Sequence, residues 1–218
     1  MRYPNAPHSR RHLALRLVAG LILAQPALAD PFATAVADAA AGRHGEAAAG
    51  FHALALSGDA EAAYNLALLF MSGQGLPQNH IEAAYWAWQA RLAGLTQAGP
   101  LLSRLSGRLD RAGQQSVSDR LEAALSPLAA QGDGAAMLSL AAVMQHVRPT
   151  PDLSQAHAWQ SIAAALDVPG AIAARDASLQ AMDTASRTRA EAEAMAAFQA
   201  WCRNRGAAAP ASCSVVQD

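Results

Sequence analysis

Apolar residues recur at helical spacing through most of the chain after residue 30. The clearest case is 60–71, where apolar positions follow the i, i+3, i+4, i+7 order that gathers them on one helix face. These positions are Ala63, Leu66, Ala67 and Phe70. Residues 79–93 carry a second stripe, in which small alanines flank Trp86 and let two helices approach closely around the indole. The pattern predicts a helical hairpin with Leu66, Phe70 and Trp86 in its core.

The same pattern returns about 73 residues later. The phrase Ala-x-x-Trp-x-x-x-Ala occurs at 83–90 and again at 156–163, and the stripe of the preceding helix returns at 137–144. The counterparts of the first core residues are Leu140, Met144 and Trp159. This repetition predicts a stack of similar hairpins, each burying its apolar face against its neighbour.

Short breakers divide the chain at regular intervals. Gly58, Gly94, Gly132 and Asp167 are 36, 38 and 35 residues apart, and each step is long enough for two helices of three or four turns. No run of alternating β-branched residues predicts a strand. We therefore expect an all-α fold, an α-solenoid of about five antiparallel helical hairpins. The expected helices are 32–41 with 45–57, 60–71 with 79–93, 98–111 with 115–130, 135–145 with 153–166, and 170–182 with 186–203.

The connection between 60–71 and 79–93 contains residues suited to a tight turn. Gly73 and Gly75 supply left-handed backbone, and Asn79 is the expected N-cap of the second helix. In the fourth hairpin Asp152 takes the capping place, while the glycine turn is replaced by residues 146–151.

These features together resemble the Sel-one-like repeat, a relative of the tetratricopeptide repeat. The resemblance rests on Leu66-Ala67-x-x-Phe70, Gly73-x-Gly75, Asn79, Ala83-x-x-Trp86 and Ala90-x-x-x-Gly94. It is close across 58–98 and recognisable across 132–170, with departures at Ala67, Phe70 and Ala87, where the family favours Gly, Tyr and Tyr. The resemblance implies a right-handed superhelix that binds proteins or peptides, often in the bacterial cell envelope.

The first 29 residues differ from the rest and are predicted to be a cleaved signal peptide. Four arginines without an acid precede a short apolar run at 17–24, and the small residues Ala27-Leu28-Ala29 follow. The apolar run is too short to span a bilayer. Cleavage is expected between Ala29 and Asp30, which leaves a helical repeat domain at 30–205 and a tail at 206–218. Arg10-Arg11 also resembles a twin-arginine signal, so the export route stays open.

Charge argues against nucleic acid as a partner. Four of the 16 arginines lie at 1–29 and all 17 acids lie at 30–218, which leaves 30–218 with a net charge of −5. The remaining basic residues are scattered, so no polybasic patch predicts binding to an anionic membrane.

Candidate chemistry is sparse. The histidines form no HExxH motif, no serine lies in a GxSxG or SxxK motif, and Gly73-Gln74-Gly75 lacks the Lys-Ser/Thr of a phosphate loop. We therefore expect no metal site, no cofactor and no catalysis. The two cysteines, Cys202 and Cys213, are expected to form a disulfide that holds the tail to the last helix, with free thiols as the alternative.

The hints of a binding surface are an excess of aromatic residues and a few positions beside the apolar stripe. Tyr85 and Trp88 have Ala158 and Ser161 as counterparts, so the core does not require aromatic residues there. They either pack on a neighbouring hairpin or anchor a partner. In related arrays, positions such as Asn65, Leu68 and Ser139 line the groove, although an ordinary solvated helix face would look the same.

The sequence thus predicts an exported, non-enzymatic helical scaffold that binds a protein or peptide partner in the bacterial cell envelope. One alternative is an envelope hydrolase or cell-wall-modifying enzyme with its site in a groove. Another is a structural adaptor that uses an end hairpin. The identity of the partner and the oligomeric state are not encoded in any motif.

Overall fold

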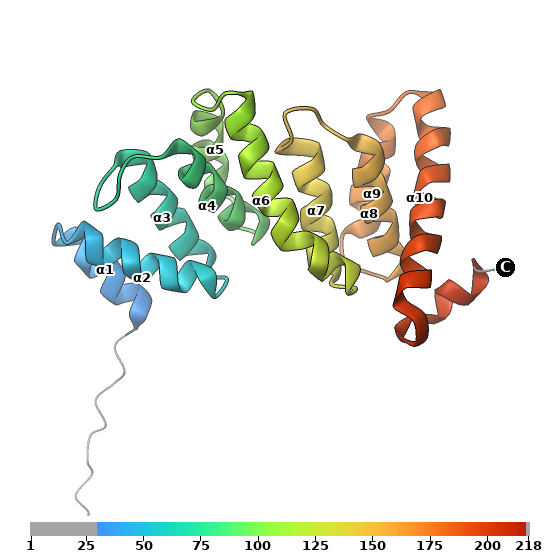
Figure 1. Cartoon of the computed structure of the whole chain (residues 1–218), viewed down its shortest axis with the longest axis horizontal. Coiled ribbons are helices and arrows are strands. Elements are labelled where there is room, and N and C mark those ends of the chain that lie inside the picture. The colour runs from blue at the N-terminus through green and yellow to red at the C-terminus, as the bar shows by residue number, and fades with distance from the viewer. Residues whose placement is uncertain (1–29, 217–218) are drawn as a thin grey trace, which may run out of the picture.

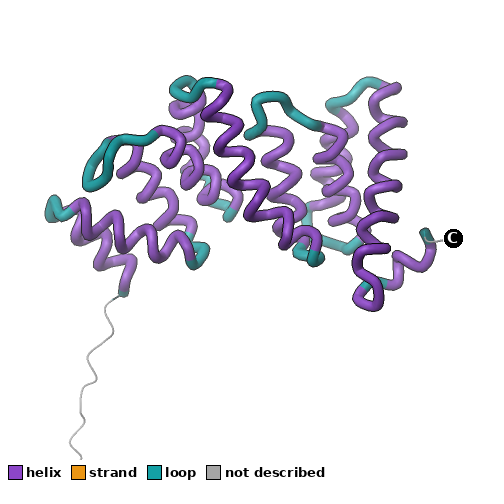
Figure 2. Tube along the Cα trace, in the orientation of Figure 1, coloured by secondary structure: helices purple, strands orange, loops and turns teal. Residues whose placement is uncertain are grey.

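A computed structural model describes residues 30–216, and the predicted signal peptide at 1–29 lies outside this range. The described chain is all-α and forms an open, curved stack of helices (Figures 1 and 2). The α-solenoid predicted from the sequence is confirmed. Its helices are α1 Pro31–Ala40, α2 His44–Leu56, α3 Ala60–Ser72, α4 His80–Leu92, α5 Ala98–Ser106, α6 Arg111–Ala130, α7 Gly134–His146, α8 Leu153–Ala165, α9 Ala171–Gln180 and α10 Thr184–Arg205, followed by the 3-10 turns η1 Gly206–Ala208 and η2 Ala211–Val215.

Side-chain caps set most of the helix starts. Asn79 accepts hydrogen bonds from the backbone N–H groups of Ile81 and Glu82, and Asp152 accepts one from Gln155, as predicted. The break between α5 and α6 falls earlier than expected, because Asp110 caps a new helix through the N–H of Gly113 at 2.7 Å. The third hairpin is therefore 98–106 with 111–130.

Helix packing divides the stack into two similar units of four helices. In the first unit, α3–α6, helix α4 packs against α3, α5 and α6; in the second, α7–α10, helix α8 packs in the same way against α7, α9 and α10. Helices α5 and α6 make few contacts with one another, and so do α9 and α10. The third pair, α5 with α6, and the fifth pair, α9 with α10, are therefore consecutive in the chain but do not pack on each other as a hairpin. Both helices of each pair pack instead on α4 or α8.

Caps and turns repeat with the same spacing as the helices. The N-caps Asp59, Asn79 and Asp110 of the first unit correspond to Asp133, Asp152 and Asp183 of the second. Gly94 has φ +98°, and its counterpart Asp167 has φ +56°, so both turns use left-handed backbone. The sequence period of about 73 residues is therefore the length of one four-helix unit.

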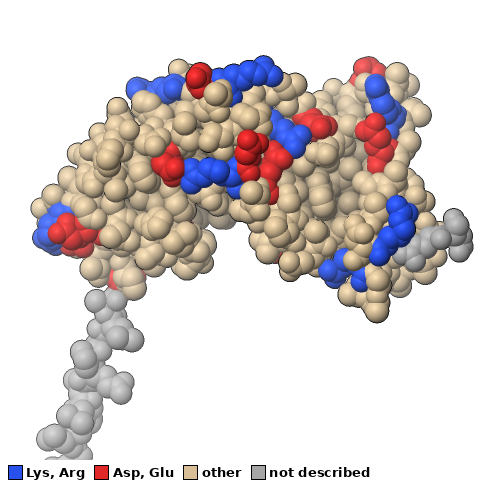
Figure 3. Space-filling model, viewed as in Figure 1, with Lys and Arg blue, Asp and Glu red and all other residues tan. Residues whose placement is uncertain are grey.

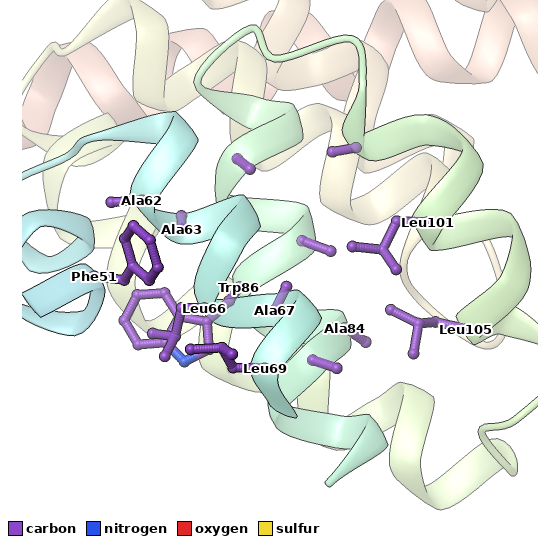
Figure 4. Packing of buried hydrophobic residues seen from close by; sticks show 14 of the residues in the cluster. Phe51, Ala62, Ala63, Leu66, Ala67, Leu69, Ala84, Trp86, Leu101 and Leu105 are labelled. Carbon is purple, nitrogen blue, oxygen red and sulfur yellow. The ribbon is translucent and has the colours of Figure 1, made fainter. Parts of the chain in front are cut away.

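The core consists of small and large apolar side chains interleaved between helices. Trp86 is 6% exposed and lies with Leu66 and Phe51 between the helices of the N-terminal half (Figure 4). Alanines such as Ala62, Ala67 and Ala84 are buried around them and allow the close approach. A second cluster fills the space between α7, α8 and α10 around Met137, Leu140 and Trp201.

Candidate functional site

A cleft of about 680 Å³ opens between α4, α5 and α7, and we call it the α4–α7 cleft. Its apolar wall consists of Trp88 and Leu92 from α4, Leu102 from α5 and Leu138 from α7. These side chains are all partly exposed. The cleft is a wide surface hollow with an aromatic residue in its wall, and a cleft of this size can hold several side chains of a ligand.

The polar part of the cleft carries positive charge and hydroxyl groups. The polar lining residues are Arg91, Ser103, Ser106, Ser139 and His146, and no Asp or Glu lines the cleft. Arg91 is exposed and makes no ion pair with any residue in the described range. The arrangement favours a ligand that combines an apolar group with a negative charge.

The serines of α5 are not arranged for nucleophilic catalysis. The hydroxyl of Ser103 donates to the carbonyl of Gly99 at 3.2 Å, and that of Ser106 donates to the carbonyl of Ser103 at 2.9 Å. Within residues 30–216, His146 makes no side-chain hydrogen bond with either of them. A general base held against a hydroxyl is the arrangement that such chemistry uses.

Two of the predicted binding residues, Trp88 and Ser139, come together in this cleft. Asn65 does not line it, and its side-chain N–H donates to the carbonyl of Glu61 at 2.9 Å, within its own helix. Leu68 is partly buried against the N-terminal core. Asn65 and Leu68 occupy the same helix face on α3 as Ser139 and Ala142 occupy on α7. Only the α7 face borders the cleft.

Tyr85 packs against a neighbouring helix, α6, which is one of the two arrangements expected from the sequence. The guanidinium of Arg120 on α6 lies 3.9 Å from the centroid of its ring, and its hydroxyl accepts a hydrogen bond from Gln89 at 3.0 Å. Arg120 also pairs with Glu82 at 2.6 Å. Tyr85 therefore joins α4 to α6.

The predicted repeat-core residues differ in burial. Leu66, Trp86, Leu140 and Met144 are buried, whereas Phe70 and Trp159 are partly exposed while packing against the core. His52 of α2, the helix that precedes the first unit, packs against Trp86 in a T-shaped arrangement, with ring centroids 5.5 Å apart. Helix α6, which packs on α7 as α2 packs on α3, has Ser126 at the corresponding place. Trp159 is more exposed than Trp86.

The α7–α8 loop beside the cleft is held by an ion pair. Arg148 donates to both carboxylate oxygens of Glu122 on α6, at 2.7 and 2.6 Å, and also contacts Asp152 at 3.4 Å. Hydrogen bonding from Arg148 lowers the pKa of Glu122. Opposite charges lie next to each other across this face of the molecule (Figure 3). The pair fixes the loop that follows His146.

The predicted disulfide is confirmed. Cys202 and Cys213 are bonded and both are buried, so η2 is tied to the end of α10. Within residues 30–216, no three His, Cys, Asp or Glu side chains gather as metal ligands would. No helix in that range has the length and apolar character needed to cross a membrane.

The sequence missed several cleft residues. Arg91, Leu92, Leu102, Leu138 and His146 were not singled out, although residues 88, 91 and 92 share one helix face by their spacing. That face could have been found in α4, but its meeting with α5 and α7 depends on tertiary packing.

Comparison with known proteins gives limited support. No protein-family model matches the chain, and no curated protein matches it. Among solved structures, it is similar to a protective antigen present in uropathogenic Escherichia coli strains that displays an SLR fold, with 18% sequence identity and a TM-score of 0.35. The match covers 79% of this chain and 43% of that chain, so the chain spans less than half of this neighbour's length.

Proposed function

We propose that this chain is an exported scaffold of Sel-one-like repeats whose α4–α7 cleft binds a peptide segment of a protein partner in the bacterial cell envelope. The observation that carries the proposal is the cleft itself, which combines the exposed part of Trp88 with Arg91, a residue that has no ion pair within 30–216. Its role is binding and not catalysis.

The chemistry of the lining defines the segment that would fit. An apolar side chain of the partner packs against Trp88 and Leu138, and an acidic group next to it pairs with Arg91. Because α4, α5 and α7 are held by the core, the cleft is formed before the partner arrives. Little ordering cost then falls on the scaffold when a flexible segment docks.

The buried disulfide supports export. Disulfides persist in oxidising compartments such as the periplasm, and this one closes the end of the helical domain. We expect the exported protein to begin at Asp30, which caps α1 through the N–H of Phe32. N-terminal sequencing of the protein recovered from the periplasm or medium tests this step, and an intact N-terminus on the recovered protein would contradict it.

An array of short peptides that vary in acidic and apolar residues tests the binding step. Purified protein should retain peptides in which an acidic residue neighbours a large apolar one, and the best of these can be labelled for fluorescence polarisation. We expect Arg91→Glu to weaken binding about tenfold or more, because an attractive charge becomes repulsive. Trp88→Ala should weaken it by a similar factor through loss of the aromatic contact.

Arg104→Glu is the matched control, because Arg104 is an exposed α5 residue outside the cleft lining. It makes the same charge change and should leave the affinity within about twofold, since exposed charges away from a site contribute little. Equal losses for Arg91→Glu and Arg104→Glu would show that only the overall charge matters. In that case the cleft is not the binding site.

A further inference from the structure

A second pocket lies in the second unit between α8, α9 and α10. Helix α8 is the central helix of this unit, because it packs against all three of the others. The pocket has a volume of about 450 Å³, within the range of small-molecule sites, and we call it the α8–α10 pocket. The polar lining is His157 and Ser161 from α8, Arg175 from α9 and Glu191 from α10. The apolar lining includes Leu179, Met195 and Phe198.

The first unit provides an internal comparison for this pocket. A hollow of about 130 Å³ lies beside the equivalent residues Ala84, Trp88 and Leu102, and the end of α7 and the loop after it, at 146–148, also line it. Trp88 occupies the place of Ser161, and the larger Leu121 occupies the place of Ala194. Trp88, Leu102 and Ser106, the first unit's equivalents of pocket residues, also border the open α4–α7 cleft. A hollow beside the central helix thus occurs in both units, and the two differ in the side chains that line it.

The polar residues of the pocket are also specific to the second unit. At the positions of His157, Ser161, Arg175 and Glu191, the first unit has Ala84, Trp88, Leu102 and Ser118. The second unit thus has an imidazole where the first has alanine, a hydroxyl where the first has an indole, and a guanidinium where the first has leucine. Packing alone gives no reason for placing these groups together around a cavity.

His157 has unused hydrogen-bonding capacity. Its side chain is almost completely buried, at 2% exposed, and its Nε2 lies 3.3 Å from the hydroxyl of Ser161. The ring approaches the backbone of Arg175, but Nδ1 has no hydrogen-bond partner among residues 30–216. Burial lowers the pKa of His157, which favours the neutral ring. Nδ1 has almost no accessible surface, so His157 acts in the pocket through its contact with Ser161.

The two charges of the pocket have opposite sign and do not pair with each other. Arg175 lies on α9 and contacts Asp176 through Nε and Nη2, both directed to one carboxylate oxygen. Glu191 lies on α10 and makes no ion pair in the described part of the chain. A cation and an anion on two walls of one cavity, with apolar side chains beside them, fit a ligand that carries both charges.

We propose that the α8–α10 pocket binds a free α-amino acid with an apolar side chain. The carboxylate pairs with Arg175 and the ammonium group with Glu191, while the side chain packs against Leu179, Met195 and Phe198. The hydroxyl of Ser161, held by its contact with His157, supplies a further hydrogen bond to the polar end of the ligand. This site is separate from the α4–α7 cleft and does not depend on the function proposed for it.

Isothermal titration calorimetry with L-leucine and L-phenylalanine as probes tests the proposal on the full exported chain. At least one of them should give saturable binding. L-Phenylalaninamide lacks the carboxylate and N-acetyl-L-phenylalanine lacks the ammonium group, so each should bind about tenfold or more weakly than L-phenylalanine. No saturable binding of either amino acid would overturn the proposal. So would an affinity for the amide or the N-acetyl compound equal to that for L-phenylalanine.

Variants taken from the first unit locate the site. Arg175→Leu and Glu191→Ser introduce the residues found at the equivalent positions, and each should reduce affinity about tenfold or more. Ser161→Trp should abolish binding, because the indole would occupy space that is open beside Ser161. The control is Arg203→Leu, because Arg203 is an exposed α10 residue that does not line the pocket.

Thermal melting is measured on every variant. If Ser161→Trp does not fold, the test rests on Arg175→Leu and Glu191→Ser, whose side chains reach solvent. Unchanged affinity in both of these folded variants would place the amino acid elsewhere and refute the assignment.

Discussion

Arg148 donates two hydrogen bonds to Glu122, from Nε at 2.7 Å and from Nη2 at 2.6 Å, and so joins the α7–α8 loop to α6. The equivalent loop of the first unit is shaped differently, by Gly73 and Gly75 with φ +73° at both positions. The loop between the first two helices of each unit is thus shaped by glycine backbone in the first unit and held by a side-chain ion pair in the second.

This ion pair predicts a pH-dependent contribution to stability. The pKa of Glu122 is lowered in the folded state, so its contribution is present above the ordinary value of 4.5 and is lost as pH falls through the folded pKa. Arg148→Gln should lower the free energy of unfolding by about 2 kcal/mol at pH 7. Urea unfolding of both proteins from pH 7 to pH 3 should show the difference shrinking below pH 4.5. A difference that stays constant over this range would contradict the assignment.

The backbone of Asp167 predicts a stabilising substitution. Asp167 has φ +56°, whereas Gly94 holds the equivalent place in the first unit without the steric cost of a side chain. Asp167→Gly should raise the free energy of unfolding by about 1 kcal/mol. The reverse change, Gly94→Asp, should lower it by a similar amount, because open space surrounds a Cβ added at Gly94 and only the backbone is strained. Denaturant unfolding measures both; loss of stability in Asp167→Gly would refute the argument.

The two tryptophans of the repeated phrase should differ in their contribution to stability. Trp86 is 6% exposed and contacts His52, so Trp86→Ala should cost about 3–5 kcal/mol by leaving a large void. Trp159 is partly exposed, and Trp159→Ala should cost clearly less. Equal losses in thermal and urea unfolding would show that the two indoles are equally buried in solution.

Removal of the disulfide should destabilise the C-terminal end of the stack. Cys202 and Cys213 are 11 residues apart, and a loop of this length predicts a loss of about 3 kcal/mol when the bond is absent. The double variant Cys202→Ala, Cys213→Ala avoids burying a new polar group. Its melting temperature should match that of the wild-type protein under reducing conditions. If oxidised wild type and the double variant melt alike, the bond does not stabilise this end.

Helix positions were predictable because each helix carries local information. The apolar spacing, the acidic or Asn caps and the glycine breaks all act within a few residues, and they placed most helix ends within two residues of the observed ones. The break between α5 and α6 was misplaced because Asp110 was not recognised as a cap. The packing of α5 and α6 around α4 involves contacts between separate helices, which no local pattern specifies.

Binding residues were harder to predict for the same reason. Trp88 was singled out because its counterpart is Ser161, and it does line a cleft. The comparison also works in the other direction. Aligning the two units places polar residues of the second unit, Ser161, His157 and Arg175, at positions where the first unit has apolar ones. The cavity between them could not be foreseen without the relative positions of α8, α9 and α10.

The four-helix period makes the molecule modular. Gly58 and Gly132 both have left-handed backbone, with φ +94° and +95°, and an Asp cap follows each, so the chain enters α3 and α7 by equivalent routes. Helix α2 packs on α3 as α6 packs on α7. If one four-helix unit were inserted or removed at Gly58 or Gly132, the helices brought together would therefore pack as α2 packs on α3. Such a protein can lengthen or shorten in evolution by gene-segment duplication or loss, without inventing a new interface each time.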